Sequence, residues 1–203
     1  PRMMVLAAAL VATAAVSYPT LRTTPWMPLQ GIVNLAMSIS PERGRSLEFR
    51  LMNEEELLER AMERPAFGWG GWGRSLFYDP YNGRLTSVPD GQWVILIGAR
   101  GIFGYLAQLL LLLTPILALL RAMPGGRHPP RKAEMVVLGA ISLMLAMNML
   151  DLIPNATMTP LTWLTAGALL GNARRLRQGV SDPADLPAAQ RILPKKAGLR
   201  TVL

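Results

Sequence analysis

Ile102 to Leu120 reads IFGYLAQLLLLLTPILALL, and this run contains no charged side chain. An α-helix rises about 1.5 Å per residue, so roughly 20 apolar residues cross the hydrocarbon core of a bilayer. The run meets that length, and a domain of this size can hardly enclose such a helix on every side. It therefore predicts a membrane-spanning helix and decides the fold class.

Three shorter blocks also lack charged side chains: Met3–Tyr18, Met135–Leu150 and Ala156–Asn172. Hydrophobic residues make up 51% of the chain and charged residues only 17%, a composition unusual for a soluble domain. Taken alone, each short block could also be a buried helix of a soluble bundle. Together with the long run they predict an all-α polytopic membrane protein with about four spans, at residues 1–18, 93–120, 134–153 and 156–172.

Charge is distributed unevenly between the segments that flank these helices. Residues 121–133 and the tail at 173–203 are rich in Arg and Lys, whereas acids and bases nearly balance in residues 19–92. By the positive-inside rule the two basic segments are cytoplasmic and residues 19–92 form an external, periplasmic loop. The formal net charge of +8 then follows from topology, and we expect no nucleic-acid partner.

The chemistry of the side chains limits the kinds of site to expect. The chain has no cysteine and a single histidine, His128, in a proline-rich basic loop. We therefore expect no metal and no cofactor. Because the chain starts at Pro1, we expect it to be the C-terminal part of a larger polytopic protein. A signal peptide is the alternative, but Ser17-Tyr18-Pro19 is a poor cleavage site.

The external loop is expected to contain an amphipathic helix. Asn53 followed by Glu56 resembles a capping box at a helix start, and Pro65 would end the helix. The spacing of four apolar residues predicts one apolar face if the helix extends upstream; these are Leu47, Leu51, Leu58 and Met62. We expect it to lie along the membrane surface. Prolines disfavour a regular helix from Tyr18 to Gln30, where Trp26 is placed like an interfacial anchor.

A glycine- and tryptophan-rich stretch, RPAFGWGGWGR at residues 64–74, follows this helix. Trp69 and Trp72 offer ring faces on which a sugar could stack, and Arg64 and Arg74 are suited to bind phosphate oxygens. These four residues are candidates for substrate binding. The alternative is a flexible interfacial turn that tryptophan side chains anchor at the membrane.

Two ionisable residues lie near the start of the long helix. Asp90 could accept a proton from a hydroxyl group or cap the helix, and the sequence alone favours capping. Arg100 lies seven residues past Trp93, about 10 Å deeper along a helix, so it is a further candidate unless it reaches back to the headgroups. Glycines at every third position predict close approach of another helix here; they are Gly98, Gly101 and Gly104.

The order of these features resembles the C-terminal half of the O-antigen ligase and polymerase family. The resemblance covers residues 43–120: an arginine, an amphipathic helix, R-P-x-x-G-x-G at residues 64–70, then a polar residue leading a helix marked Gly101-Ile102-Phe103-Gly104. Asp151-Leu152-Ile153-Pro154-Asn155 and the last helix fit less specifically.

This resemblance implies a multi-helix glycosyltransferase of the bacterial inner membrane. Such enzymes act at the periplasmic face, without metal or nucleotide sugar, and transfer a glycan from an undecaprenyl diphosphate carrier to lipid A core or to another carrier-linked glycan. Arg50 best matches the family arginine that engages the diphosphate, with Arg45 second. Where many members have His-Asn, this chain has Asp90-Gly91. Asp90 would then be the catalytic base, and ligase and polymerase activity both stay open.

A non-catalytic transport or scaffold subunit of a polysaccharide export system is the alternative. An enzyme predicts that Arg50, Arg64, Arg74 and Asp90 gather at one external site, whereas a transporter predicts polar residues along a path near the midplane. The tail at 173–203 is expected to be an irregular cytoplasmic extension that either touches anionic lipid or stays without a partner.

Overall fold

The computed structural model describes residues 1–22, 28–123 and 132–178. Six α-helices account for most of these residues: α1 (Arg2–Arg22), α2 (Leu29–Ile39), α3 (Pro41–Met62), α4 (Gln92–Ala122), α5 (Lys132–Asp151) and α6 (Pro160–Gln178). Within the described ranges the only β-type pairing is an isolated antiparallel bridge between Tyr78 and Leu85. The all-α fold class is confirmed.

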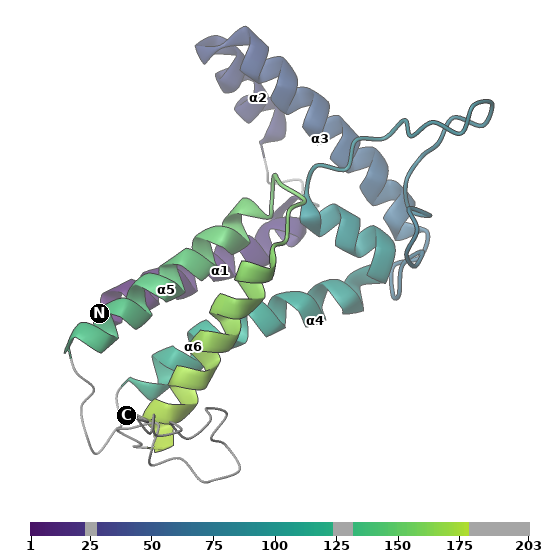
Figure 1. The fold of residues 1–203 in the computed structure, drawn as a ribbon. Coiled ribbons are helices and arrows are strands. Elements are labelled where there is room, and N and C mark those ends of the chain that lie inside the picture. The colour runs from purple at the N-terminus through teal and green to yellow at the C-terminus, as the bar shows by residue number, and fades with distance from the viewer. Residues whose placement is uncertain (23–27, 124–131, 179–203) are drawn as a thin grey trace, which may run out of the picture.

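Helices α1, α5 and α6 and the longer part of α4 form a bundle, in which α1 packs on α5 and α4 packs on α6 (Figure 1). The buried face of α1 repeats every three or four residues and consists of small side chains: Val5, Ala8, Ala12 and Ala15. Small side chains let helix backbones approach closely, as is typical of membrane helix pairs. The opposing core comes largely from α4 and α5, with Leu112, Ile116, Leu119, Leu145 and Met149.

Three of the described helices are long and apolar enough to cross a membrane: α1, α4 and residues 133–151 of α5. This finding supports a multi-pass membrane protein. The fourth expected span corresponds to α6, which begins at Pro160 rather than Ala156. Its last turns carry Arg174, Arg175 and Arg177, so α6 is less apolar than these three helices and is not among the candidate spans.

Except for Arg22, the arginines of the bundle helices lie toward one end of the bundle. The starts of α1 and α5 and the ends of α4 and α6 lie together at the lower left of Figure 1. Arg2, Arg121 and Arg174 mark this end, and an ion pair between Arg175 and Glu134 joins α6 to α5 there. Helix α3 and the segment that follows it lie at the opposite end.

The external loop contains more helix than expected. Helix α1 continues through Pro19 to Arg22, because its last turn is held by side-chain contacts to α3 and α4 that are described below. Helix α2 was not predicted. Helix α3 begins at Pro41, with Ser40 at the N-cap position, and ends before Pro65 as expected. Trp26 lies outside the described residues.

The predicted cap at Asn53 is wrong because this residue lies within α3. Its side-chain amide donates a hydrogen bond to the Phe49 carbonyl at 2.8 Å, and its Oδ1 accepts one from the Val88 N–H at 3.0 Å. Asn53 therefore ties the segment before α4 to α3. The buried side of α3 is also shifted from the predicted leucine stripe: it contains Gly44, Asn53, Glu54, Leu57 and Ala61.

Candidate functional site

Helix α4 is broken at Gly101, whose φ of 69° and ψ of −175° are not helical. Figure 1 shows α4 turning sharply part-way along, so that its first part lies beside α3 and the rest belongs to the bundle. A continuous helix would pair the N–H of Ile102 with the carbonyl of Gly98, and the N–H of Phe103 with that of Ala99. The break leaves these four backbone groups without helical partners.

The R-P-x-x-G-x-G segment supplies the missing partners. Its backbone makes four hydrogen bonds to the break: Trp69 N–H to Gly98 O at 2.8 Å, Gly70 N–H to Ala99 O at 2.8 Å, Ile102 N–H to Pro65 O at 2.8 Å and Phe103 N–H to Ala66 O at 3.3 Å. These bonds give the four backbone groups the partners that the helix no longer supplies. Gly98, Gly101 and Gly104 were predicted to allow close approach of another helix. At Gly101 the element that approaches closely is this loop segment.

Arg50 and Asp90 form an ion pair, with 3.4 Å between Arg50 Nε and Asp90 Oδ2. Arg50 comes from α3 and Asp90 from the residues that precede α4. The side chains are 45% and 31% exposed, so both remain accessible to a ligand. The expectation that Asp90 caps α4 is wrong, since Gly91 takes the N-cap position without a side-chain cap. Both side chains stay partly exposed to solvent and lie next to each other.

Two backbone anchors hold Asp90 in place. On one side, the Val88 N–H binds Asn53 of α3. On the other, the Gln92 N–H donates to the carbonyls of Leu152 at 3.1 Å and Asn155 at 3.2 Å, so the segment between α5 and α6 receives the start of α4. The D-L-I-P-N motif therefore positions the first turn of α4 and, through it, Asp90.

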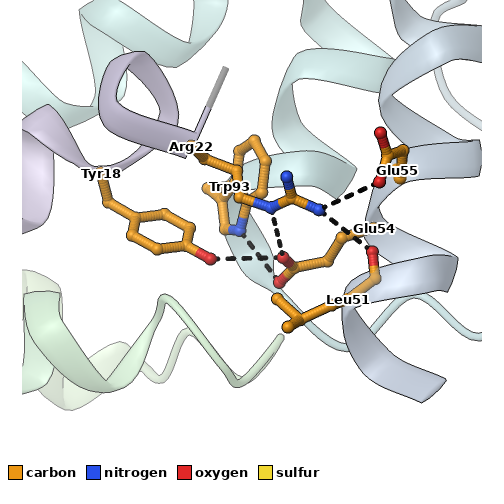
Figure 2. A network of polar contacts seen from close by, with 6 residues as sticks. All are labelled: Tyr18, Arg22, Leu51, Glu54, Glu55 and Trp93. Atoms are coloured by element: carbon orange, nitrogen blue, oxygen red, sulfur yellow. Dashed lines mark hydrogen bonds and ion pairs between the residues drawn. The ribbon is translucent and has the colours of Figure 1, made fainter. Parts of the chain in front are cut away.

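A buried carboxylate, Glu54, lies one helical turn from Arg50 and is the centre of a polar network (Figure 2). Tyr18 Oη donates to Glu54 Oε2 at 3.3 Å, and Trp93 Nε1 donates to Glu54 Oε1 at 3.4 Å. Arg22 Nε lies 3.8 Å from Glu54 Oε2. Three helices, α1, α3 and α4, thus meet at this carboxylate.

Arg22 also binds α3 through two further groups. Its Nη2 donates to the Leu51 carbonyl at 3.2 Å and lies 3.6 Å from Glu55 Oε2 (Figure 2). The Tyr18 and Trp93 rings pack edge to face, with 5.4 Å between their centroids. These contacts fix the rotation of α3 relative to α4, which is the rotation that brings Arg50 to Asp90.

Burial raises the pKa of Glu54 above the ordinary glutamate value. The Trp93 hydrogen bond, the Arg22 charge and the Tyr18 hydrogen bond each act to lower this pKa, while the negative charge of Asp90 raises it further. Desolvation outweighs the favourable contacts. The Asp90 charge is the smallest of these influences on the Glu54 pKa.

Sequence reasoning missed this network. Tyr18 and Arg22 stand four positions apart at the end of an apolar helix, as do Arg50 and Glu54 in α3. Such spacing places each pair on one helix face and was the available signal. It could not show that the two faces meet.

Arginines cover Trp69 in this structure. The Cζ atoms of Arg60 and Arg64 lie 3.7 Å and 4.2 Å from its ring centroid, and its Nε1 donates to the Arg60 carbonyl at 2.8 Å. Such cation–π contacts stabilise the end of α3 against the loop. The indole that was expected to receive a sugar is therefore engaged within the protein, and Arg60 is a member of this cluster that sequence reasoning did not select.

The other candidate binding residues lie on the surface around the glycine-rich segment. Trp72 is 97% exposed and has a positive φ of 66°. Arg74 is exposed, and its Nε donates to the Gly71 carbonyl at 3.1 Å. Both side chains are available to a ligand from outside the loop.

Arg45 and Arg100 are placed differently from the central pair. Arg45 is exposed in the first part of α3, and its Nε donates to the Pro41 carbonyl at 3.3 Å. Arg100 is exposed immediately before the break at Gly101. The break follows Arg100, so the helical rise of about 10 Å from Trp93 to Arg100 is retained, and the depth of Arg100 in the bilayer stays a prediction. Of the two arginines considered for the diphosphate, only Arg50 is paired with Asp90.

Among residues 1–22, 28–123 and 132–178, no group of three or more His, Asp or Glu side chains is placed to hold a metal ion. The chain was also compared with known proteins. No family model, no curated protein and no solved structure matches it.

Proposed function

We propose that this protein is a membrane glycosyltransferase of the O-antigen ligase and polymerase type. It transfers a glycan from an undecaprenyl diphosphate carrier to a lipid-linked or glycan acceptor at the periplasmic face of the bacterial inner membrane. The observation that carries the proposal is the Arg50–Asp90 contact at 3.4 Å. A cation from α3 and a carboxylate from the segment before α4 meet at an accessible point, as the reaction requires.

Topology supports the external placement of this site. Except for Arg22, which is paired with Glu54 and Glu55, the arginines of the bundle lie toward the end opposite α3, so the positive-inside rule assigns that end to the cytoplasm and the Arg50–Asp90 pair to the periplasm. In this arrangement α6 is the fourth span, and Arg174 and Arg177 reach the cytoplasmic headgroups by snorkelling.

Arg50 and Asp90 each have one role in the proposed reaction. The acceptor hydroxyl attacks the anomeric carbon of the carrier-linked sugar, and the bond from that carbon to the diphosphate oxygen breaks. The diphosphate leaves with the electron pair, and Asp90 takes the hydroxyl proton. Arg50 binds the diphosphate oxygens and stabilises the charge that develops on the leaving group. The diphosphate already activates the sugar, so the reaction needs no cofactor.

Substrate approach changes the partner of Arg50. Its guanidinium, now held by Asp90, turns to the diphosphate, and the Asp90 carboxylate becomes free to accept a proton. Arg64, Arg74 and Arg100 add positive charge around the glycine-rich segment, and Trp72 offers an open ring face for a sugar. Arg45 is retained as a more distant contact to the carrier.

Complementation of a cell that lacks the full-length protein tests the proposal, with the lipopolysaccharide or polysaccharide ladder as the readout. Wild type should restore the ladder, Arg50→Ala and Asp90→Asn should not, and Arg43→Ala is the matched control on the exposed face of the same helix. Full transfer by Asp90→Asn would remove Asp90 from the mechanism. A deletion cell with a normal ladder would contradict glycosyl transfer altogether.

One observation favours the second candidate, a transport or scaffold subunit of an export system. Broken membrane helices often carry the substrate site of transporters, and α4 is broken at Gly101. Here, however, residues 65–70 occupy the freed backbone groups, which leaves them no role in binding a substrate. The glycosyltransferase therefore remains the better supported function.

A further inference from the structure

Helix α2 differs in composition from the helix on which it packs. Residues 29–39 read LQGIVNLAMSI and contain no charged side chain, whereas α3 is rich in Arg and Glu. Val33 is buried in the contact between the two helices. A Cβ atom added to Gly44 of α3 would lie 2.6 Å from Met37 Cα, so the backbones are in close contact. One face of α2 thus packs against α3.

The remaining surface of α2 divides into a polar and an apolar stripe. Gln30, Asn34 and Ser38 repeat every four residues, and Gln30 Nε2 donates to Asn34 Oδ1 at 3.3 Å. The apolar stripe has the spacing i, i+3 and i+7, and its side chains are 41%, 63% and 77% exposed at Ile32, Leu35 and Ile39. The apolar stripe therefore lacks a partner within the described part of the chain.

Chain connection places α2 near the membrane surface. Arg22 ends α1, a candidate span, and Leu29 follows seven positions later, at most about 25 Å away in an extended chain. Figure 1 shows the α2–α3 pair crossing the end of the bundle where α1 ends, rather than continuing along the bundle. Helix α2 thus lies near the boundary where the lipid-facing surfaces of the spans end.

We propose that α2 is an interfacial helix that inserts Ile32, Leu35 and Ile39 into the outer leaflet of the bilayer. Lipid acyl chains are apolar and uncharged, which matches this stripe, and Gln30, Asn34 and Ser38 face the headgroups and water. A second protein is a poorer occupant, because a specific interface buries about 800 Å² per partner and three side chains supply much less. Helix α2 then holds α3, and with it the Arg50–Asp90 pair, at headgroup height.

These 203 residues contain no cysteine, so an introduced thiol is the only one among them that can be labelled. Leu35→Cys and Ser38→Cys of the full-length protein would each carry a bimane label in vesicles of phosphatidylethanolamine and phosphatidylglycerol. Lipids brominated on the acyl chain should quench the Leu35 label severalfold more than the Ser38 label, and aqueous iodide should do the reverse. The pair Ile39→Cys and Asn34→Cys repeats the test one turn away.

Two outcomes would overturn the proposal. Equal quenching of both labels by iodide would show that the stripe faces water. A Leu35 label that neither quencher reaches would show that protein covers the stripe, whether another segment or a second copy. Both outcomes leave glycosyl transfer untouched, because the placement of α2 depends on the membrane topology and not on the reaction.

Discussion

Gly68 and Gly101 face each other backbone to backbone, and each has a φ of 69°. A Cβ atom on Gly68 would lie 2.6 Å from the Gly101 nitrogen, and one on Gly101 would overlap the carbonyl group of Ala66. Only glycine allows this approach, because other residues adopt such a φ at a cost and bring a side chain into the contact. The pair therefore decides whether residues 65–70 can satisfy the broken α4.

Gly101→Ala should destabilise the protein by about 2–4 kcal/mol, since it combines an unfavourable φ with steric overlap. Gly68→Ala should act in the same direction. Gly71→Ala is the matched control, because Gly71 lacks a positive φ and has no atom within 4 Å of its added Cβ. Thermal unfolding in detergent, followed by circular dichroism, measures the difference. Equal midpoints for Gly101→Ala and Gly71→Ala would contradict the packing of the loop on the break.

Arg50→Ala should separate activity from stability. The Arg50–Asp90 pair is substantially exposed, with side chains 45% and 31% accessible, so its loss should change the unfolding free energy by less than about 1 kcal/mol. Loss of the charge that stabilises the leaving group should lower glycan transfer by at least about 100-fold. Transfer by purified protein in vesicles and unfolding of the same sample give the two values. A parallel fall in both would assign Arg50 a structural role instead.

Glu54 should make the stability of the protein depend on pH. Burial raises the pKa of Glu54, so the folded state binds its proton more tightly than the unfolded state does. The free energy of unfolding should therefore fall as pH rises from the ordinary glutamate pKa, about 4.3, through the raised value, and the Glu54 contribution should be flat above it.

Glu54→Gln tests this dependence, because an amide cannot titrate; its oxygen can accept from Trp93 Nε1, while its NH2 group can donate to the Tyr18 hydroxyl. The variant should lack the part of the pH slope that Glu54 supplies. Urea unfolding of both proteins across this pH range measures it. Identical slopes would show that Glu54 titrates alike in the folded and unfolded states.

Thiol labelling should report the sidedness of the bundle. Tyr81 is 97% exposed beyond α3, and Arg177 is exposed at the basic end of α6. In spheroplasts, a membrane-impermeant maleimide should label Tyr81→Cys directly and Arg177→Cys only after lysis, as the positive-inside rule requires. The reverse pattern would place the Arg50–Asp90 pair in the cytoplasm, away from the proposed carrier-linked substrate.

The sequence by itself determined the helical class and three candidate spans. Hydropathy acts along the chain, so the charge-free run at Ile102–Leu120 predicts a membrane helix whatever surrounds it. Asp90 and Arg50 were also selected from the sequence, on the family resemblance, before their contact was known. Helix α2 was missed because it has only 11 residues and the prolines before it pointed to an irregular segment.

Only the tertiary structure decided which groups contact residues such as Glu54 and Gly101. Glu54 looks in the sequence like an ordinary glutamate at the start of a helix, yet contacts from α1 and α4 make it a buried carboxylate. Gly101 looks like one of three helix-packing glycines, yet a loop that follows α3 occupies its break. Both outcomes depend on groups far apart in the chain, and local propensity carries no information about such contacts because they exist only once the helices have packed.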